Sequence, residues 1–131
     1  MKWWPKECEF GNIIRIKIGS VWHYGIFASE NEVIQFGLPP VNLGGINAGE
    51  VRVVSTDIDV FASGRIVEKG VAEGKEKKKL RSPQKIVEAA RARIGEGGYD
   101  LMNNNCEQFA FECAFGEHFS AQTKSTEDKW K

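Results

Sequence analysis

The spacing of apolar residues changes once along the chain, and this change constrains the fold more than any other feature of the sequence. Before residue 82, short segments alternate apolar and polar residues or are rich in β-branched and aromatic side chains, which predicts strands. The predicted strands cover residues 13–18, 21–28, 32–36, 51–54, 58–61 and 65–68. After Ser82-Pro83, a typical helix start, apolar residues recur at helical spacing as far as Ile94. Strands followed by helices predict an α+β fold, in which an antiparallel sheet from the N-terminal half packs against C-terminal helices.

Three further segments complete the expected organisation. Residues 37–50 are rich in glycine and proline and are predicted to form a long loop. Residues 69–81 are highly charged and are predicted to form a solvated connector between the strands and the helices. The polar residues 117–131 are predicted to form a tail. A length of 131 residues suits one folding unit, so we expect a single domain over 1–131.

Charge and composition exclude several classes of function. The 18 basic and 18 acidic residues give a formal net charge of zero, which removes the general attraction to nucleic acids. No apolar run approaches the roughly 20 residues of a membrane-spanning helix, and no N-terminal stretch has the length of a signal peptide. Three cysteines cannot all pair, and unpaired thiols fit a reducing compartment. We therefore expect a cytoplasmic protein that has no transmembrane segment and binds no nucleic acid.

Cys106 is the first candidate for chemistry because it is predicted to open the last helix. Asn105 can cap this helix, and Gln108 stands at the third helical position, as in a capping box. The free N–H groups and partial positive charge of a helix N-terminus are expected to lower the pKa of the thiol and to stabilise an oxyanion. The alternative is a small buried apolar side chain. Cys113, two turns further along, and Cys8 are predicted to be structural.

A thiol nucleophile needs a base, and the sequence offers only His23 and His118. His118 follows the predicted end of the Cys106 helix. His23 lies in a predicted strand, and the rigidity of a strand suits a catalytic base. Gln35, on the next strand, is the candidate to orient the imidazole of His23.

The hairpin between these two strands decides whether His23 and Gln35 can meet. A three-residue loop at 29–31, ending with Asn31 in the left-handed conformation, would place Gly25 opposite Gln35. The two polar side chains would then share one face of the sheet, with open space above Gly25. A two-residue loop would direct them to opposite faces. The sequence favours the three-residue loop because asparagine tolerates the left-handed conformation.

Neither a metal nor a cofactor is expected. Zinc ligands normally come in close pairs, whereas six residues separate Cys106 from Cys113 and the sequence has no histidine pair. The glycines at 95–98 follow a helix rather than a strand, so they are predicted to end that helix and not to bind a nucleotide.

Three separated motifs carry a family resemblance: residues 22–27 (WHYGIF), 33–36 (VIQF) and 104–110 (NNCEQFA). Together they resemble the lecithin:retinol acyltransferase domain family over about residues 10–116. The resemblance implies a circularly permuted, papain-like fold of the NlpC type. It also implies that Cys106 is the nucleophile, His23 its base and Gln35 the third member of the site. Animal members commonly carry histidines at the positions of Gln35 and Gln108, and several have a C-terminal hydrophobic anchor that this sequence lacks.

By this resemblance, the expected function is that of a cysteine-dependent acyl hydrolase or acyltransferase. A thioester would form on Cys106, and the substrate would be a lipid or another acyl ester. Peripheral contact with a membrane would involve the loop at 37–50 or the basic cluster at 75–81, whose other interpretation is a merely solvated surface. Two alternatives stay open: a thiol peptidase or amidase of the NlpC type, and a non-catalytic interaction module that has kept the fold. The sequence does not indicate an oligomeric state.

Overall fold

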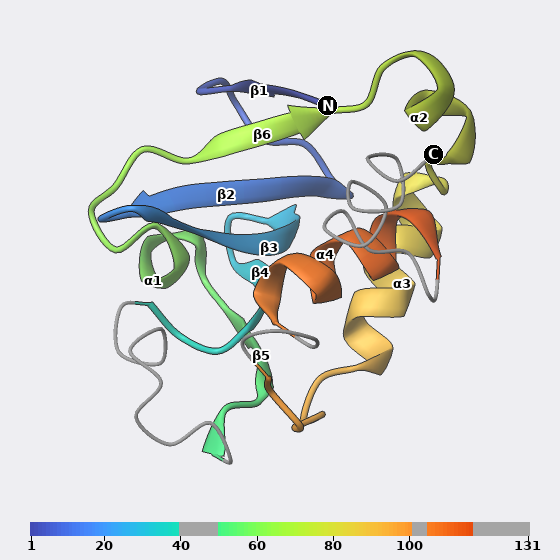
Figure 1. Ribbon diagram of the computed structural model, residues 1–131. Coiled ribbons are helices and arrows are strands. Elements are labelled where there is room, and N and C mark those ends of the chain that lie inside the picture. The colour runs from blue at the N-terminus through green and yellow to red at the C-terminus, as the bar shows by residue number, and fades with distance from the viewer. Residues whose placement is uncertain (40–49, 101–104, 117–131) are drawn as a thin grey trace, which may run out of the picture.

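A six-stranded antiparallel sheet forms the centre of the computed structural model, which describes residues 1–39, 50–100 and 105–116 (Figure 1). The strand order is β1-β6-β2-β3-β4-β5, so the β2-β3-β4-β5 meander is extended by β6 and by the N-terminal strand. The strands are β1 (Lys2–Trp4), β2 (Asn12–Ile18), β3 (Val21–Ser29), β4 (Glu32–Phe36), β5 (Val53–Thr56) and β6 (Glu68–Val71). The sheet comes from the N-terminal half of the chain, and the two long helices follow it. This arrangement confirms the predicted α+β fold.

Helices cover both faces of the sheet. Helices α3 (Pro83–Ala92) and α4 (Cys106–Phe115) pack on each other and on β3, while α1 (Ile58–Ala62) packs against β4 (Figure 1). The short helix α2 (Gly74–Lys79) has no buried residue. Two apolar cores result. The larger core, on the α3 and α4 face, includes Ile26, Ile34, Phe36, Ile86, Val87 and Phe109, and the smaller core, on the α1 face, contains Ile14, Ile16, Phe27, Val33 and Phe61.

Both long helices begin where their caps predict. The Ser82 hydroxyl accepts a hydrogen bond from the Lys85 N–H, and the Asn105 side chain accepts one from the Gln108 N–H. These bonds satisfy N–H groups that lack partners within the helix. Helix α3 ends at Ala92, earlier than expected, and Ile94 beyond it is 46% exposed.

The strand predicted at 58–61 is wrong, because this segment forms α1. Asp57 caps the helix, its carboxylate accepting a hydrogen bond from the Val60 N–H at 2.9 Å. The alternation of Ile58, Asp59, Val60 and Phe61 is therefore that of a single helical turn, which buries Phe61 alone. The Asp57 cap outweighed the β-propensity of these residues, because in a helix of only five residues one capping hydrogen bond acts on most of the helix.

Other boundaries shift as well. The strand predicted at 65–68 lies at Glu68–Val71, and the one predicted at 51–54 lies at Val53–Thr56. The predicted connector at 69–81 therefore contains most of β6 and the whole of α2. Strand β1 was not predicted. Most of the predicted loop at 37–50 and all of the predicted tail at 117–131 lie outside the described residues.

The β3-β4 hairpin gives the expected register through a different loop. Gly25 is paired with Gln35, as predicted, but the hairpin closes with Ser29 opposite Glu32. The loop therefore has two residues, and Asn31 is not in the left-handed conformation. A β-bulge between Phe27 and Ser29 adds one residue to β3 and restores the parity that a two-residue loop alone would have reversed.

Candidate active site

Cys106 is the first residue of α4, and its side chain is only 4% exposed. The Asn105 carboxamide accepts a hydrogen bond from the Gln108 N–H at 2.9 Å, and the Asn105 carbonyl accepts one from the Phe109 N–H at 2.9 Å. The side chain and the backbone carbonyl of Asn105 therefore both accept hydrogen bonds from the first turn of α4, which stabilises this turn. The thiol is fixed at a helix N-terminus, where backbone N–H groups are available to a negative charge.

The thiol of Cys106 lies against the part of β3 that extends beyond its pairing with β4. The two strands pair from Gly25 to Ser29, whereas Trp22 to Tyr24 pair with β2 alone among the described residues. The Cys106 Sγ donates a weak hydrogen bond to the Trp22 carbonyl at 4.0 Å, and the Tyr24 backbone N–H stabilises the thiolate form. The edge of β3 therefore offers the sulfur an acceptor for its proton and a donor for its negative charge.

His23, between those two residues, is held by Gln35. Both side chains are 0% exposed, and the His23 Nε2 is 2.8 Å from the Gln35 Oε1. The Gln35 Nε2 donates in turn to the Thr56 Oγ1 at 2.7 Å, and the Thr56 hydroxyl donates to the Asp57 carbonyl at 3.0 Å. The other ring nitrogen of His23, Nδ1, has no hydrogen-bond partner among the described residues. One imidazole nitrogen is therefore tied to a polar chain, and the other makes no hydrogen bond to Cys106 or to any other described residue.

Phe61 from α1 packs against His23. The two ring centroids are 5.3 Å apart, with 30° between the ring planes. Open space above Gly25 was predicted, and this prediction is wrong, because a Cβ added there would lie 2.8 Å from the Phe61 ring. The glycine instead allows Phe61 to approach the sheet, which removes water from one side of His23.

Burial sets the protonation states of the two candidate groups. Desolvation lowers the pKa of His23 to about 4, and the hydrogen bond to the Gln35 oxygen opposes this shift. Desolvation raises the pKa of the Cys106 thiol to about 11, and backbone hydrogen bonds from Tyr24, Glu107 and Cys106 oppose it. The predicted lowering of the thiol pKa by the helix N-terminus is therefore wrong, since burial outweighs the backbone donors. Near neutral pH the site holds a neutral thiol and a neutral imidazole.

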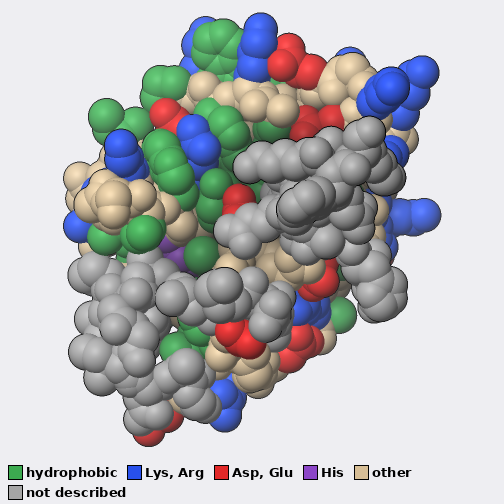
Figure 2. Space-filling model, in the orientation of Figure 1, with side chains coloured by type: hydrophobic (Ala, Val, Ile, Leu, Met, Phe, Trp, Pro, Cys, Tyr) green, Lys and Arg blue, Asp and Glu red, His purple; other side chains and the backbone are tan. Residues whose placement is uncertain are grey.

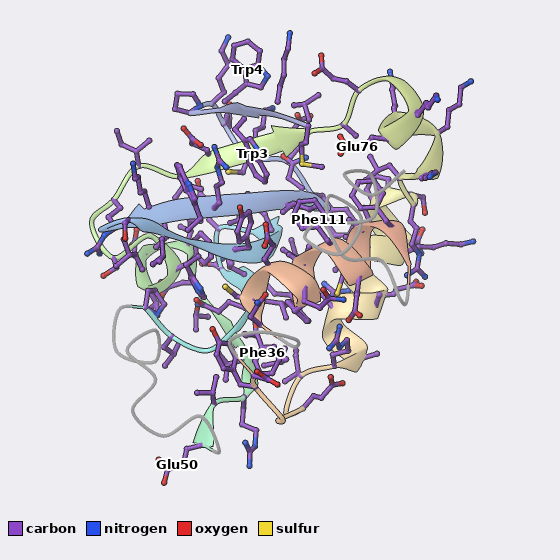
Figure 3. The ribbon with its side chains drawn as sticks, viewed as in Figure 1. Trp3, Trp4, Phe36, Glu50, Glu76 and Phe111 are labelled. Atoms are coloured by element: carbon purple, nitrogen blue, oxygen red, sulfur yellow. The ribbon has the colours of Figure 1, made fainter. Side chains whose placement is uncertain are left out.

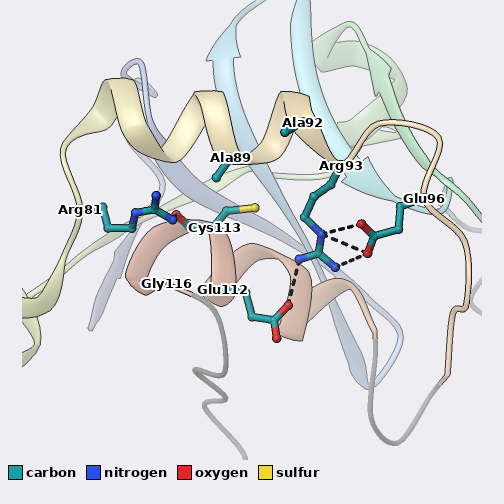
Figure 4. Close-up of a pocket in the computed structure, with 8 residues that line it drawn as sticks. All are labelled: Arg81, Ala89, Ala92, Arg93, Glu96, Glu112, Cys113 and Gly116. Carbon is teal, nitrogen blue, oxygen red and sulfur yellow. Dashed lines mark hydrogen bonds and ion pairs between the residues drawn. The ribbon is translucent and has the colours of Figure 1, made fainter.

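The other candidate residues lie elsewhere or are not described. Cys113 is 1% exposed and lines a cavity of about 610 Å³ between α3 and α4, together with Ala89, Ala92, Arg81, Arg93, Glu96, Glu112 and Gly116 (Figure 4). Neither Cys106 nor His23 lines this cavity. Cys8 is half-buried, and His118 lies outside the described residues. Within the described ranges, no cluster of three or more histidine, cysteine, aspartate or glutamate side chains is suited to a metal ion.

A cation–aromatic stack lies on the α4 face of the sheet. The Arg15 guanidinium is 4.2 Å from the Trp3 ring centroid and 3.7 Å from that of Trp22, and its Nε donates to Glu68 at 2.8 Å. Trp3 and Trp4 point to opposite sides of β1 (Figure 3), and Trp4 is 42% exposed. Figure 2 shows hydrophobic side chains gathered on this part of the surface with basic side chains among them.

No helix in the described part of the chain is long and apolar enough to cross a membrane.

The sequence did not point to Thr56 or Phe61. The predicted strand at 51–54 ended before Thr56, and the predicted strand at 58–61 concealed the helix that presents Phe61. The Asp57 cap was the one local signal that could have indicated α1.

Comparison with known proteins identifies the family of the chain. A sequence model of the family described as "Lecithin retinol acyltransferase" matches residues 6–119, most of the chain. The chain is also 26% identical over 140 aligned positions to lecithin retinol acyltransferase from Mus musculus. That alignment covers 92% of this chain and 60% of the mouse protein, so the chain spans somewhat less than two thirds of its relative.

Proposed function

Because the chain belongs to the lecithin retinol acyltransferase family, we propose that it transfers acyl groups from lipid or other acyl esters by way of a thioester on Cys106. The family name and that of the mouse relative support acyl transfer as the reaction class. The observation that carries the proposal is the buried His23–Gln35 pair, whose free Nδ1 leaves a proton acceptor beside the strand edge that contacts the thiol.

In this proposal His23 acts as a general base. As the sulfur attacks the ester carbonyl, the thiol proton passes from its contact with the Trp22 carbonyl to the His23 Nδ1. The tetrahedral oxyanion collapses, the C–O bond to the alcohol breaks, and the imidazolium gives its proton to the departing alkoxide. The products of this half-reaction are the alcohol and an S-acyl Cys106.

The second half-reaction reverses these roles. An acceptor alcohol, an amine or water gives a proton to the His23 Nδ1 while its oxygen or nitrogen attacks the thioester carbonyl. The C–S bond breaks, and the sulfur recovers the proton from the imidazolium. Water as the acceptor gives a hydrolase, and a second alcohol or an amine gives a transferase.

The raised pKa of Cys106 and the lowered pKa of His23 favour this order of events over a pre-formed ion pair. With pKa values of about 11 and about 4, the proton rests on sulfur in the free protein. In this proposal the proton moves only when negative charge develops on the substrate oxygen, and we expect the Cys106 backbone N–H to donate a hydrogen bond to that oxygen.

Intact-mass spectrometry tests the proposal. We expect that mixing the protein with phosphatidylcholine vesicles, or with a short-chain activated ester, adds one acyl group in place of the thiol hydrogen. Peptide mapping should place the adduct on Cys106 in the wild-type protein and in Cys113→Ala, and the adduct should be absent in Cys106→Ser. Reaction with peptide amides and not with esters would favour a peptidase or amidase instead. No adduct with any of these substrates would favour an interaction module.

A further inference from the structure

Gln35 joins side chains on two neighbouring strands. Gly25 on β3 and Val54 on β5 lie directly opposite Gln35. His23 and Thr56 are each two residues from those positions, so both are diagonal neighbours of Gln35 on the same face of the sheet. Diagonal neighbours in a sheet are too far apart for short side chains to meet, but within reach of a long one. The glutamine therefore bridges three strands, with its oxygen directed to His23 and its nitrogen directed to Thr56.

This chain of hydrogen bonds has one direction because it ends on a backbone carbonyl. The Asp57 carbonyl can only accept, so the Thr56 hydroxyl uses its single proton there and accepts from the Gln35 NH₂ through a lone pair. With its nitrogen committed to Thr56, the amide presents its oxygen to the His23 Nε2. The His23 Nε2 must then carry the imidazole proton, and the His23 Nδ1 holds the free lone pair.

The Asp57 carbonyl is itself fixed. Asp57 is the N-cap of α1, where its side chain accepts from the Val60 N–H at 2.9 Å and its carbonyl also accepts from the Phe61 N–H at 3.3 Å. The polar chain is thus anchored to the same short helix that presses Phe61 against His23.

We propose that Thr56 is a positioning residue that holds the Gln35 amide in one orientation and thereby fixes His23 as the Nε2–H tautomer, with Nδ1 as the base. An amide has almost the same shape when its oxygen and nitrogen are exchanged, so packing alone does not choose between the two orientations. The exchanged amide would require the Thr56 hydroxyl to turn away from Asp57. It would also place the imidazole proton on Nδ1, where no acceptor exists among the described residues. In that tautomer the base would be lost.

The tautomer of His23 is directly measurable. We expect long-range ¹H–¹⁵N spectra of the ¹⁵N-histidine protein near neutral pH to show a protonated Nε2 and an unprotonated Nδ1, with the His23 signals identified by their loss in His23→Gln. Thr56→Val keeps the shape and the β-branching of the side chain but removes the hydroxyl. We expect it to give a mixture of tautomers and to lower kcat about tenfold while KM changes little.

Two variants control for general damage to β5. Thr56→Ser restores the hydroxyl and should restore both the tautomer and kcat. Ser55→Val makes a comparable change at an exposed neighbour on the same strand and should alter neither. An Nδ1–H tautomer in the wild-type protein, or an unchanged tautomer in Thr56→Val, would overturn the inference.

This inference relies on the proposed function only for its effect on kcat. If the tautomer follows Thr56 as expected but the wild-type protein forms no acyl adduct, the proposed function fails and the role of Thr56 in orienting His23 stands. If the adduct forms but the tautomer does not depend on Thr56, the proposed function stands and the inference fails.

Discussion

The two ends of α4 each bury a cysteine, and the two thiols differ less in their pKa than in what surrounds them. Burial raises the pKa of Cys106 to about 11 and that of Cys113 to about 12. At the C-terminal end, the Arg93 guanidinium lowers the pKa of Cys113 against the effect of burial, yet this cation is already paired with Glu96 and Glu112 (Figure 4).

At the N-terminal end, the stabilising groups are uncharged. Backbone N–H groups face the Cys106 sulfur, and a histidine with one free nitrogen occupies the adjoining strand. Thiol acidity therefore does not distinguish Cys106 from Cys113. Among the described residues, only the Cys106 end combines a buried histidine that has an unpaired ring nitrogen with backbone donors near the sulfur, and this is the end to which we assign nucleophilic catalysis in our proposal.

Removing each thiol in turn should separate the two ends most sharply. Cys106→Ala is expected to lower kcat/KM for ester hydrolysis by roughly four orders of magnitude or more, because the proposed acyl intermediate forms on its thiol. Cys113→Ala should stay within about threefold of wild type, since a thiol that only packs does not contribute to the transition state. Initial rates with a chromogenic ester test both variants. An equal loss in the two would remove the distinction between the ends.

Phe61 contributes to the Cys106 end through its packing against His23. Phe61 is 0% exposed, so Phe61→Ala should lower the free energy of unfolding by about 3–4 kcal/mol by opening a cavity. Water entering that cavity should move the pKa of His23 up from about 4 towards its ordinary value of 6.5. Urea denaturation and an NMR titration of His23 measure the two effects.

The matched control for this change is Phe61→Leu, which retains most of the apolar volume. It should lose less stability and leave the pKa of His23 closer to the wild-type value. An unchanged pKa in Phe61→Ala would mean that Phe61 does not exclude water from the imidazole.

These features differ in how far the sequence could predict them. The caps at Ser82 and Asn105 act within one helical turn, so both helix starts were predicted correctly. The sequence also predicted that His23 and Gln35 share one face of the sheet, although a β-bulge rather than a three-residue loop sets this register.

Tertiary contacts account for what the sequence missed. Thr56 meets Gln35 only through the pairing of β4 with β5, and Phe61 meets His23 only because a five-residue helix packs on the sheet. The raised pKa of Cys106 has the same origin, because burial at a strand edge cannot be inferred from a helix N-terminus.

Acid should destabilise the protein through His23. The pKa of this group is 6.5 when unfolded and about 4 when folded, so between these values the unfolded state binds more protons. The contribution of His23 is therefore fully present above pH 6.5 and is lost progressively as the pH falls to about 4, amounting to about 3 kcal/mol. Denaturation of wild type and His23→Gln at a series of pH values isolates it, because the carboxylates are common to both. Parallel curves would contradict the burial of a neutral imidazole.

Without substrate, the two thiols should react alike. Both pKa values lie far above neutrality, so alkylation of Cys106 and of Cys113 by iodoacetamide should be slow and should rise about tenfold per pH unit. Mass mapping of each site between neutral pH and about two units above it gives the two profiles. A fast, pH-independent reaction at Cys106 would indicate an ion pair with His23 and would replace general-base activation by a pre-formed thiolate.

Arg93 offers the smallest test, at the end of α4 that carries Cys113. Its guanidinium bridges Glu96 at 2.7 Å and Glu112 at 2.9 Å and lies 5.0 Å from the Phe109 ring centroid. Arg93→Met keeps the aliphatic stem and removes the charge, which should cost about 1 kcal/mol in unfolding free energy because the ion pairs are partly exposed. The kcat for ester hydrolysis should change less than twofold, since the Glu112 partner stays hydrogen-bonded to Gln108 at 2.8 Å and the first turn of α4 stays capped. A large fall in kcat would show that the ion pairs at the Cys113 end help to position Cys106, and that α4 acts as one unit rather than as two independent ends.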